Sequence, residues 1–304
     1  MVEVNISFSG STLQHLLICE IQSKKLRFTF GVICAKKGKK QMASNRKKII
    51  GHYRDYEEEN RAISSRANKL EFHYTKKLLG EYISLNSTVI ELGCGTGYYG
   101  MYFADKCAQY TGVDLSPDNI AVFNEKILIS GKENVRALVG DAIALPEFSD
   151  NSFDIVLCMG PMYHLSRDER QYVFGECYRI AKNGATLAFA YINSIGAYAG
   201  WCINDEWRSL YPNAKANKHF LEYRTAYDNP DVFFLTSPEE MESDANQNNL
   251  EVIKNCGLDF FFAQSAINMM SDEQFTLYME LSDKMTNSPS CTGLSDHALM
   301  LCTK

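Results

Sequence analysis

A glycine-rich turn with an acid before it occupies the stretch Glu91-Leu92-Gly93-Cys94-Gly95-Thr96-Gly97. An apolar, β-branched run from Thr88 to Leu92 leads into the turn, and an aromatic, helix-compatible segment from Tyr98 to Cys107 follows it. This order predicts a strand, a tight turn and a helix. Glycine adopts backbone angles that other residues avoid, and the first N–H groups of a helix lack partners within it, so this turn could bind a ligand through its backbone.

Two kinds of ligand fit the glycines. Gly95, Gly97 and Gly100 match G-x-G-x-x-G, the dinucleotide fingerprint in which a pyrophosphate lies at a helix N-terminus. Glu91, however, places an anion beside the turn, and an anion suits a cationic ligand better than a diphosphate. A structural turn that binds nothing is a third interpretation.

A second acid follows at a spacing that suits a nucleoside. Asp114 lies near the carboxyl end of the predicted strand Tyr110 to Ser116. It stands about 20 residues after the turn, the spacing at which a carboxylate reaches ribose hydroxyl groups. Ser116 and Pro117 form a good helix start, with the serine as N-cap. The spacing favours a nucleoside and leaves NAD open.

A third acid and a histidine come after the next two predicted strands. Asp141 follows the strand Val135 to Val139, and the loop Met159 to Leu165 follows an apolar strand that ends at Cys158. Ligands lie at the carboxyl ends of strands in open α/β sheets. His164 could act there as a general base, because its ordinary pKa lies near neutrality, and Tyr163 could orient a substrate. The alternative is a histidine that only hydrogen-bonds its own loop.

Together these motifs resemble the class I S-adenosylmethionine-dependent methyltransferases, most narrowly a bacterial group of undefined substrate. Glu91 to Gly97 resembles their motif I, and the sequence Gly140-Asp141-Ala142, followed by Ser-Phe-Asp and an apolar strand, resembles their third and fourth strand region. The donor carries a sulfonium and an amino group. The resemblance implies a methionine end near Glu91, a ribose on Asp114, an adenine on Asp141, and a cofactor-binding set of Glu91, Gly93, Cys94, Gly95, Gly97, Asp114, Leu115, Asp141, Ala142 and Met159.

The implied fold is α/β, a doubly wound seven-stranded sheet that is mostly parallel, with the last strand antiparallel. The sixth strand is predicted at Phe260-Phe261-Phe262 and the seventh at His297 to Cys302. Residues 42–304 would form this domain. Residues 195–251, which hold both tryptophans, are predicted to be an inserted helical and aromatic cap over the site, or else an elaboration whose aromatic residues form its own core.

Residues 1–41 are predicted to be a basic extension that is either poorly ordered or lineage-specific. Residues 1–50 hold ten Lys or Arg and two Glu, whereas the rest of the chain holds 21 basic and 35 acidic residues. An acidic body repels phosphate backbones, so nucleic-acid binding is not expected outside the arm. Ten cysteines without a C-x-x-C pair favour a reducing compartment. With no membrane-spanning run and no evident signal peptide, we expect a cytoplasmic protein.

The predicted function is transfer of a methyl group from S-adenosylmethionine to an N, O or S nucleophile of a small molecule, leaving S-adenosylhomocysteine. No metal is expected. The alternative is an RNA or protein methyltransferase that uses the basic arm. A NAD-dependent oxidoreductase or a non-catalytic nucleotide-binding module is a further alternative. The sequence names neither the acceptor nor the oligomeric state.

Overall fold

The computed structural model describes residues 45–53, 64–203, 209–225, 227, 232–260 and 264–304. The predicted arm, residues 1–41, lies outside them. The chain divides into two units after Lys48, and every element described below belongs to the second, Ile49–Lys304. Among the described residues, no helix has the length and apolar character needed to cross a bilayer.

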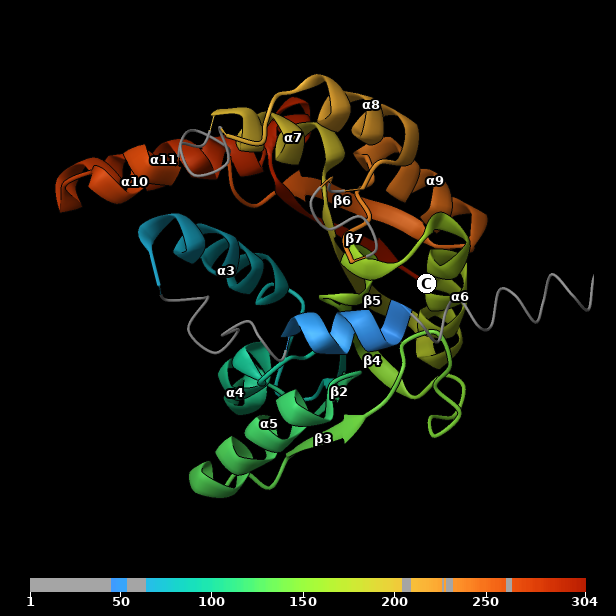
Figure 1. Cartoon of the computed structure of the whole chain (residues 1–304). Coiled ribbons are helices and arrows are strands. Elements are labelled where there is room, and N and C mark those ends of the chain that lie inside the picture. Colours follow the sequence, from blue (N-terminus) through green and yellow to red (C-terminus); the bar gives the residue numbers. More distant parts are fainter. Residues whose placement is uncertain (1–44, 54–63, 204–208, 226, 228–231, 261–263) are drawn as a thin grey trace, which may run out of the picture. The chain divides into compact units, whose positions relative to one another are not determined.

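Seven strands form one sheet in the order β3-β2-β1-β4-β5-β7-β6 (Figure 1). β1 to β5 pair in parallel, and β7 runs antiparallel to both of its neighbours. This confirms the predicted doubly wound, mostly parallel fold. The strands are β1 (Thr88–Leu92), β2 (Gln109–Asp114), β3 (Val135–Val139), β4 (Phe153–Cys158), β5 (Ala181–Ile192), β6 (Glu251–Gly257) and β7 (His297–Thr303).

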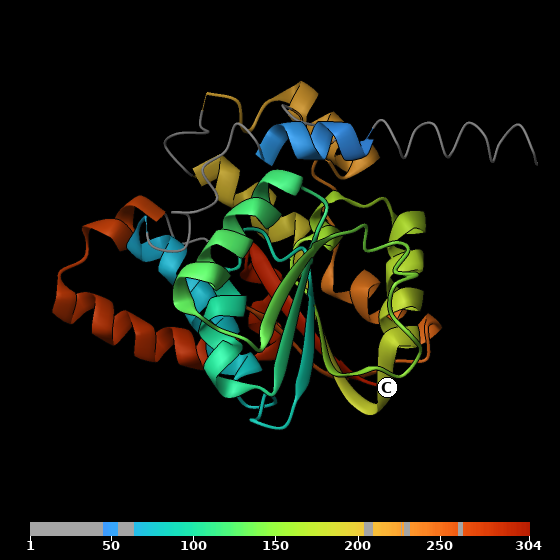
Figure 2. The ribbon, with the colours of Figure 1, turned by 90° about the horizontal axis from the view of Figure 1, so that it is seen from below.

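The helices cover both faces of the sheet. Alternate residues of a strand point to opposite faces; thus Val89 packs with α3, α4, α5 and α11, whereas Ile90 packs with α6 and α9. Figure 2 shows α4 and α5 on one side of the sheet and α6 on the other. The helices are α3 (Arg66–Leu79), α4 (Tyr98–Phe103), α5 (Pro117–Ser130), α6 (Arg167–Ile180), α7 (Ser194–Ile203), α8 (Ala214–Tyr223), α9 (Pro238–Gln247), α10 (Gln264–Met269) and α11 (Asp272–Thr286), with 3₁₀ turns η1 (Ala104–Lys106), η2 (Pro161–His164) and η3 (Pro289–Leu294).

The predicted position of the sixth strand is wrong. β6 is Glu251–Gly257, and Phe260 makes only an isolated bridge to Ser295; Phe261 and Phe262 lie outside the described residues. β6 is one of the two edge strands of the sheet, and several of its side chains are at least partly exposed. A half-exposed strand with polar residues carries a weaker pattern than an apolar triplet, which explains the error.

The segment predicted as a cap contains α7, α8 and α9. Four aromatic rings from α7, α8 and the turn between them pack together: the ring of Tyr198 lies 4.4 Å from that of Phe220, and the ring of Trp201 lies 5.1 Å from that of Tyr211. α9 instead buries its apolar side against the sheet beside α6. The role of residues 195–251 as a cap remains a prediction.

Candidate functional site

The site lies where the strand order reverses, between β1 and β4. Chain connections leave these neighbouring strands in opposite directions, which opens a crevice at their carboxyl ends. A cavity that opens to solvent lies there. It is lined by Glu71, Phe72, Glu91, Gly93, Cys94, Gly95, Thr96, Tyr98, Tyr99 and Met159.

The glycine turn forms one wall of this cavity. Its first residue, Gly93, has a φ of +76°, and a Cβ there would lie 2.6 Å from the ring of Pro161. The carbonyl of Val113 accepts hydrogen bonds from the N–H groups of Gly93 (2.7 Å) and Cys94 (3.1 Å), which ties the turn to β2. The close approach to Pro161 joins the ends of β1 and β4, so a side chain at Gly93 would push apart the two loops that frame the cavity.

Gly97 has a packing role as well. Its φ is +84°, and a Cβ there would lie 2.1 Å from the ring of Phe123 on α5. A Cβ at Gly100 would meet the same ring at 2.4 Å. Two of the three glycines of the dinucleotide fingerprint are therefore required by packing between α4 and α5, whichever ligand the turn binds.

Glu91 carries a hydrogen bond and, near neutral pH, a proton. Its side chain is buried at the cavity wall, and the hydroxyl of Tyr110 donates to its Oε2 at 2.7 Å. Burial raises the pKa of Glu91 to about 8, although the bond from Tyr110 favours the charged form. The acid predicted to supply a negative charge beside the turn is therefore mainly neutral at pH 7 when no ligand is present.

Asp114 fastens the turn from β2. Its Oδ2 accepts the N–H of Gly95 (2.9 Å), and its Oδ1 accepts the N–H of Ser116 (2.8 Å) and the amide of Asn119 (3.3 Å). Burial raises the pKa of Asp114, opposed by these donors. Each carboxylate oxygen has two lone-pair positions, and among the described residues Oδ2 accepts the hydrogen bond from Gly95.

Asp141 and Ala142 lie after β3, beside the end of β2. The N–H of Gly140 donates to the carbonyl of Asp114 at 2.9 Å, which joins the two strand ends. Oδ1 of Asp141 accepts the N–H of Ile143 at 3.2 Å. The sheet thus brings the predicted ribose and adenine residues, with Leu115 between them in the chain, to one edge. Among the described residues, however, the lining of the cavity comes from α3, the end of β1, the turn, α4 and Met159.

His164 is buried in η2 with both ring nitrogens hydrogen-bonded. Nδ1 lies 2.8 Å from the carbonyl of Val232, which can only accept, so Nδ1 carries the proton. Nε2, 2.8 Å from the hydroxyl of Tyr53, therefore accepts from that tyrosine. Burial lowers the pKa of His164 to about 4, so the ring is neutral at pH 7. Tyr163, its neighbour, is also buried.

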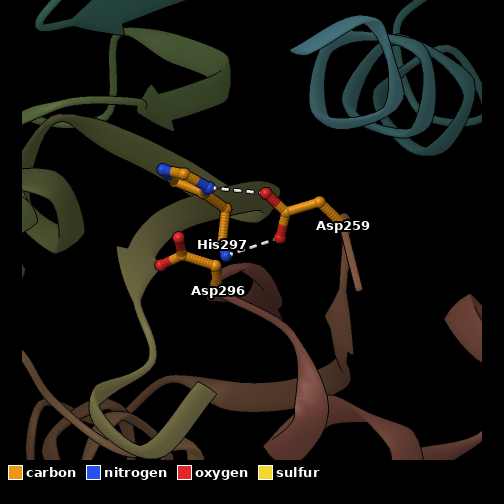
Figure 3. A group of neighbouring side chains, drawn as sticks. All are labelled: Asp259, Asp296 and His297. Atoms are coloured by element: carbon orange, nitrogen blue, oxygen red, sulfur yellow. Dashed lines mark hydrogen bonds and ion pairs between the residues drawn. The ribbon is translucent and has the colours of Figure 1, made fainter. Parts of the chain in front are cut away.

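Sequence reasoning missed the residues that reach the site from distant segments. Glu71 and Phe72 enter the cavity wall from α3, where nothing in the local sequence distinguishes them from other amphipathic positions. His297, at the start of β7, lies near Tyr163, with ring centroids 6.1 Å apart. Asp259 accepts hydrogen bonds from the ring Nδ1 and from the backbone N–H of His297, both at 2.8 Å (Figure 3).

Asp259, Asp296 and His297 are also the described residues whose donor atoms come close enough to hold a metal ion, all within 4.8 Å of one another. The Nδ1 of His297 is already committed to Asp259. We assign no metal to this group.

Comparison with known proteins identifies the central part of the chain. Residues 89–184 match the family model described as a methyltransferase domain. A phosphoethanolamine N-methyltransferase from Plasmodium falciparum is 31% identical over 115 residues, 37% of this chain and 42% of that protein. A ubiquinone biosynthesis O-methyltransferase from Nitrosomonas europaea is 29% identical over 127 residues, 41% of this chain and 52% of that protein. The matched region thus spans about half the length of these relatives.

The fold also has solved counterparts. A structure of a Haloferax volcanii complex between the Trm112 methyltransferase activator and a methyltransferase aligns with 77% of this chain and 90% of the matched chain, at a TM-score of 0.51 and 20% identity. At this level of identity the likeness shows the fold alone, and one fold can host several reactions.

Proposed function

We propose that this protein, whose residues 89–184 match a methyltransferase-domain family model, is a class I S-adenosylmethionine-dependent methyltransferase that transfers the methyl group of that cofactor to an N, O or S nucleophile of a small molecule. The observation that carries the proposal is the cavity at the switch point of the sheet, lined by the glycine turn and by the acids Glu71 and Glu91. A chain that spans about half of its relatives leaves their acceptors open, and two of those relatives act on chemically different ones.

The residues present fit the donor. The turn approaches the cavity by its backbone because Gly93 has no side chain. Cys94, Gly95 and Gly97 would complete this cradle, and Met159 would border the methionine end. Asp114 would accept a hydrogen bond from a ribose hydroxyl, and Asp141 with Ala142 would bind the adenine beside it. The donor, when bound, supplies an activated methyl group, so the protein contributes chiefly alignment.

Tyr53 and His164 are proposed to act as a pair. Because both ring nitrogens of His164 are hydrogen-bonded, Nε2 by the Tyr53 hydroxyl and Nδ1 to the Val232 carbonyl, a proton from an acceptor would reach Nε2 only by way of that hydroxyl. A ring whose pKa is about 4 is a weak base. Its main contribution would be to hold Tyr53 in place, with Tyr163 packed beside it.

The Asp114→Ala variant tests the donor assignment. Loss of this carboxylate removes a ribose partner and releases the N–H of Gly95, so the Kd for S-adenosylhomocysteine should rise by about 100-fold, the upper end of the range for one hydrogen bond to a charged group. Isothermal titration measures this, with the exposed Asp118→Ala on the same helix start as control. Equal affinity in Asp114→Ala and the wild type would contradict the assignment.

Substitutions in the basic arm, residues 1–41, test which class of acceptor the protein uses. Replacing Lys36, Lys37, Lys39 and Lys40 by alanine should leave methyl transfer to a small acceptor unchanged if the arm has no part in recognition. Loss of transfer to RNA or protein, with cofactor affinity preserved, would instead support the polymer alternative.

A further inference from the structure

His297 and Asp259 form a hydrogen-bonded pair outside the recognised motifs. His297 begins β7, and Asp259 lies in the segment after β6. The carboxylate accepts the ring Nδ1–H at Oδ2 and the backbone N–H of His297 at Oδ1, both at 2.8 Å (Figure 3). Two bonds to one residue, one from the ring and one from the main chain, fix the orientation of the imidazole.

This pair lies at the edge of the sheet where ligands bind in open α/β folds. His297 pairs with Ile192, the last residue of β5, and β5 lies beside β4, whose end leads into the loop with Tyr163 and His164. The ring centroids of His297 and Tyr163 are 6.1 Å apart. Nδ1 of His297 also lies 4.0 Å from Oε2 of Glu71, a residue of the cavity wall. The pair therefore borders the cavity on the side of the β4 loop.

One nitrogen of the His297 ring is open to a ligand. Nε2 lies on the side of the ring away from Asp259 (Figure 3), and among the described residues it has no hydrogen-bond partner. The side chain is 21% exposed, so it is not sealed in the core. His164 differs, because Tyr53 and the carbonyl of Val232 occupy both of its ring nitrogens. Of these two histidines, His297 is the one that can hydrogen-bond an acceptor molecule directly.

The charged groups around His297 keep its ring protonated. Burial alone would lower the pKa of His297, but the carboxyl groups of Glu71, Asp259 and Asp296 raise it to about 10. Burial would raise the pKa of Asp259, yet the charge and the hydrogen bonds of His297 lower it. On α11, burial and then the charge of Asp259 raise the pKa of Tyr278, so this hydroxyl stays neutral. At pH 7 the Nε2 atom therefore carries a proton and can only donate.

We infer that the Nε2–H group of His297 binds a carboxylate of the methyl acceptor, and that Asp259 positions the ring for it. The inference rests on the proposed function and adds to it a class of acceptor, small molecules that carry a carboxylate. A hydrogen bond from an imidazolium to a carboxylate is charge-assisted and among the stronger ones in proteins. Because acids already surround this ring, a group with a single negative charge suits the site better than a dianionic phosphate.

The experiment measures the binding of three probes to the full chain saturated with S-adenosylhomocysteine. Benzoate carries a carboxylate, benzamide is neutral and nearly of the same shape, and benzylamine is a cation. Isothermal titration should show that the wild type binds benzoate at least about 10-fold more tightly than the other two. His297→Gln keeps a hydrogen-bond donor but no charge, so it should raise the Kd for benzoate by about 10-fold and leave the other two within about 2-fold. His73→Gln, at an exposed position on α3, is the matched control.

A second variant separates the charge of Asp259 from its position. Asp259→Asn keeps an acceptor for the Nδ1–H group but removes the negative charge, so the pKa of His297 should fall. Benzoate binding is present below the pKa of the ring and is lost as the pH rises through it. The loss should therefore occur at a lower pH in Asp259→Asn than in the wild type. An equal weakening at every pH would overturn the positioning role of Asp259.

The outcomes separate this inference from the proposed function. If the wild type does not bind S-adenosylhomocysteine, both fail. If it binds S-adenosylhomocysteine but prefers benzamide or benzylamine, or if His297→Gln keeps the preference for benzoate, only the carboxylate assignment is overturned. Should His297→Gln yield no folded protein, the wild type decides: its affinity for benzoate must fall as the pH rises from 7 toward the His297 pKa of about 10, and a constant affinity would overturn the assignment.

Discussion

Glu91 is the residue at which burial and charge conflict most directly. A glutamate before a glycine turn reads from sequence as an anion, because sequence shows the type of a residue and not the solvent around it. In the structure the carboxyl is enclosed, receives one hydrogen bond from Tyr110, and has a pKa raised to about 8. The position of Glu91 at the cavity wall was predictable from the motif, but its protonation state was not.

This pKa predicts a pH dependence of stability. Between about pH 4.5 and pH 8 the folded protein holds a proton on Glu91 that the unfolded chain has released, so the free energy of unfolding falls as pH rises through that window. The Glu91→Gln variant has no carboxyl group at this position, so its stability lacks this dependence on pH. Urea unfolding at pH 5 and pH 8 should show the wild type losing stability relative to Glu91→Gln, on the order of a few kcal/mol. The exposed Glu125→Gln is the control for the loss of one carboxylate. If the free energies of unfolding of the wild type and Glu91→Gln change with pH in parallel, the pKa of Glu91 is not raised.

The packing around Gly97 gives a second prediction about a single residue. Alanine there would adopt a strained positive φ and meet the ring of Phe123, so Gly97→Ala should lower the free energy of unfolding by about 2–5 kcal/mol. Gly131 also has a positive φ but open space around its Cβ position. Gly131→Ala should therefore cost only about 1–2 kcal/mol. If urea unfolding showed equal losses of stability in Gly97→Ala and Gly131→Ala, the contact with Phe123 would add nothing to the cost of the substitution.

At the scale of elements, α6 and α9 are joined by a buried ion pair. Asp244 on α9 is fully buried, and its two oxygens lie 3.3 Å from guanidinium groups of Arg167 and Arg170 on α6. Arg170 is itself 4% exposed in its side chain. Removal of one partner would leave a buried charge without compensation, a situation far more costly than the loss of a surface pair.

Asp244→Ala should therefore lower the free energy of unfolding by about 3–5 kcal/mol. The control is Asp150→Ala, which removes an exposed partner of Arg179 and should cost no more than about 1 kcal/mol. Chemical denaturation of both variants measures the difference. A loss in Asp244→Ala as small as that in Asp150→Ala would show that α9 is not anchored by this pair.

The elements differ in how far sequence could predict them. β1, the turn and β2 follow from local patterns, because both strands are apolar and buried along most of their length and glycine or serine follows each of them. β3 is an edge strand like β6, but its apolar run is continuous except for Arg136, so its pattern was still recognisable. β6 was misplaced because an edge strand needs only one apolar side. The sequence also did not separate α9 from the predicted cap. α9 packs against α6 and the sheet, and these contacts are with residues distant in the chain.

At the scale of the whole molecule, the site is assembled from three parts of the chain. Residues 89–184, which match the methyltransferase-domain family model, supply the glycine turn and the acids after β2 and β3. α3 supplies Glu71 and Phe72 to the cavity wall, and the C-terminal part places His297 beside Tyr163. Motif spacing predicted the first part well. The other two depend on contacts between residues far apart in the chain, which a single sequence does not reveal.

The central claim is that the cavity at the switch point binds S-adenosylmethionine and its product. Isothermal titration of the full chain with S-adenosylhomocysteine, and with NADH as the paired ligand, tests it most directly. We predict micromolar binding of S-adenosylhomocysteine and no measurable binding of NADH. Binding of NADH alone would contradict the account, return Gly95, Gly97 and Gly100 to the dinucleotide fingerprint, and remove the roles proposed here for Glu91 and Asp141.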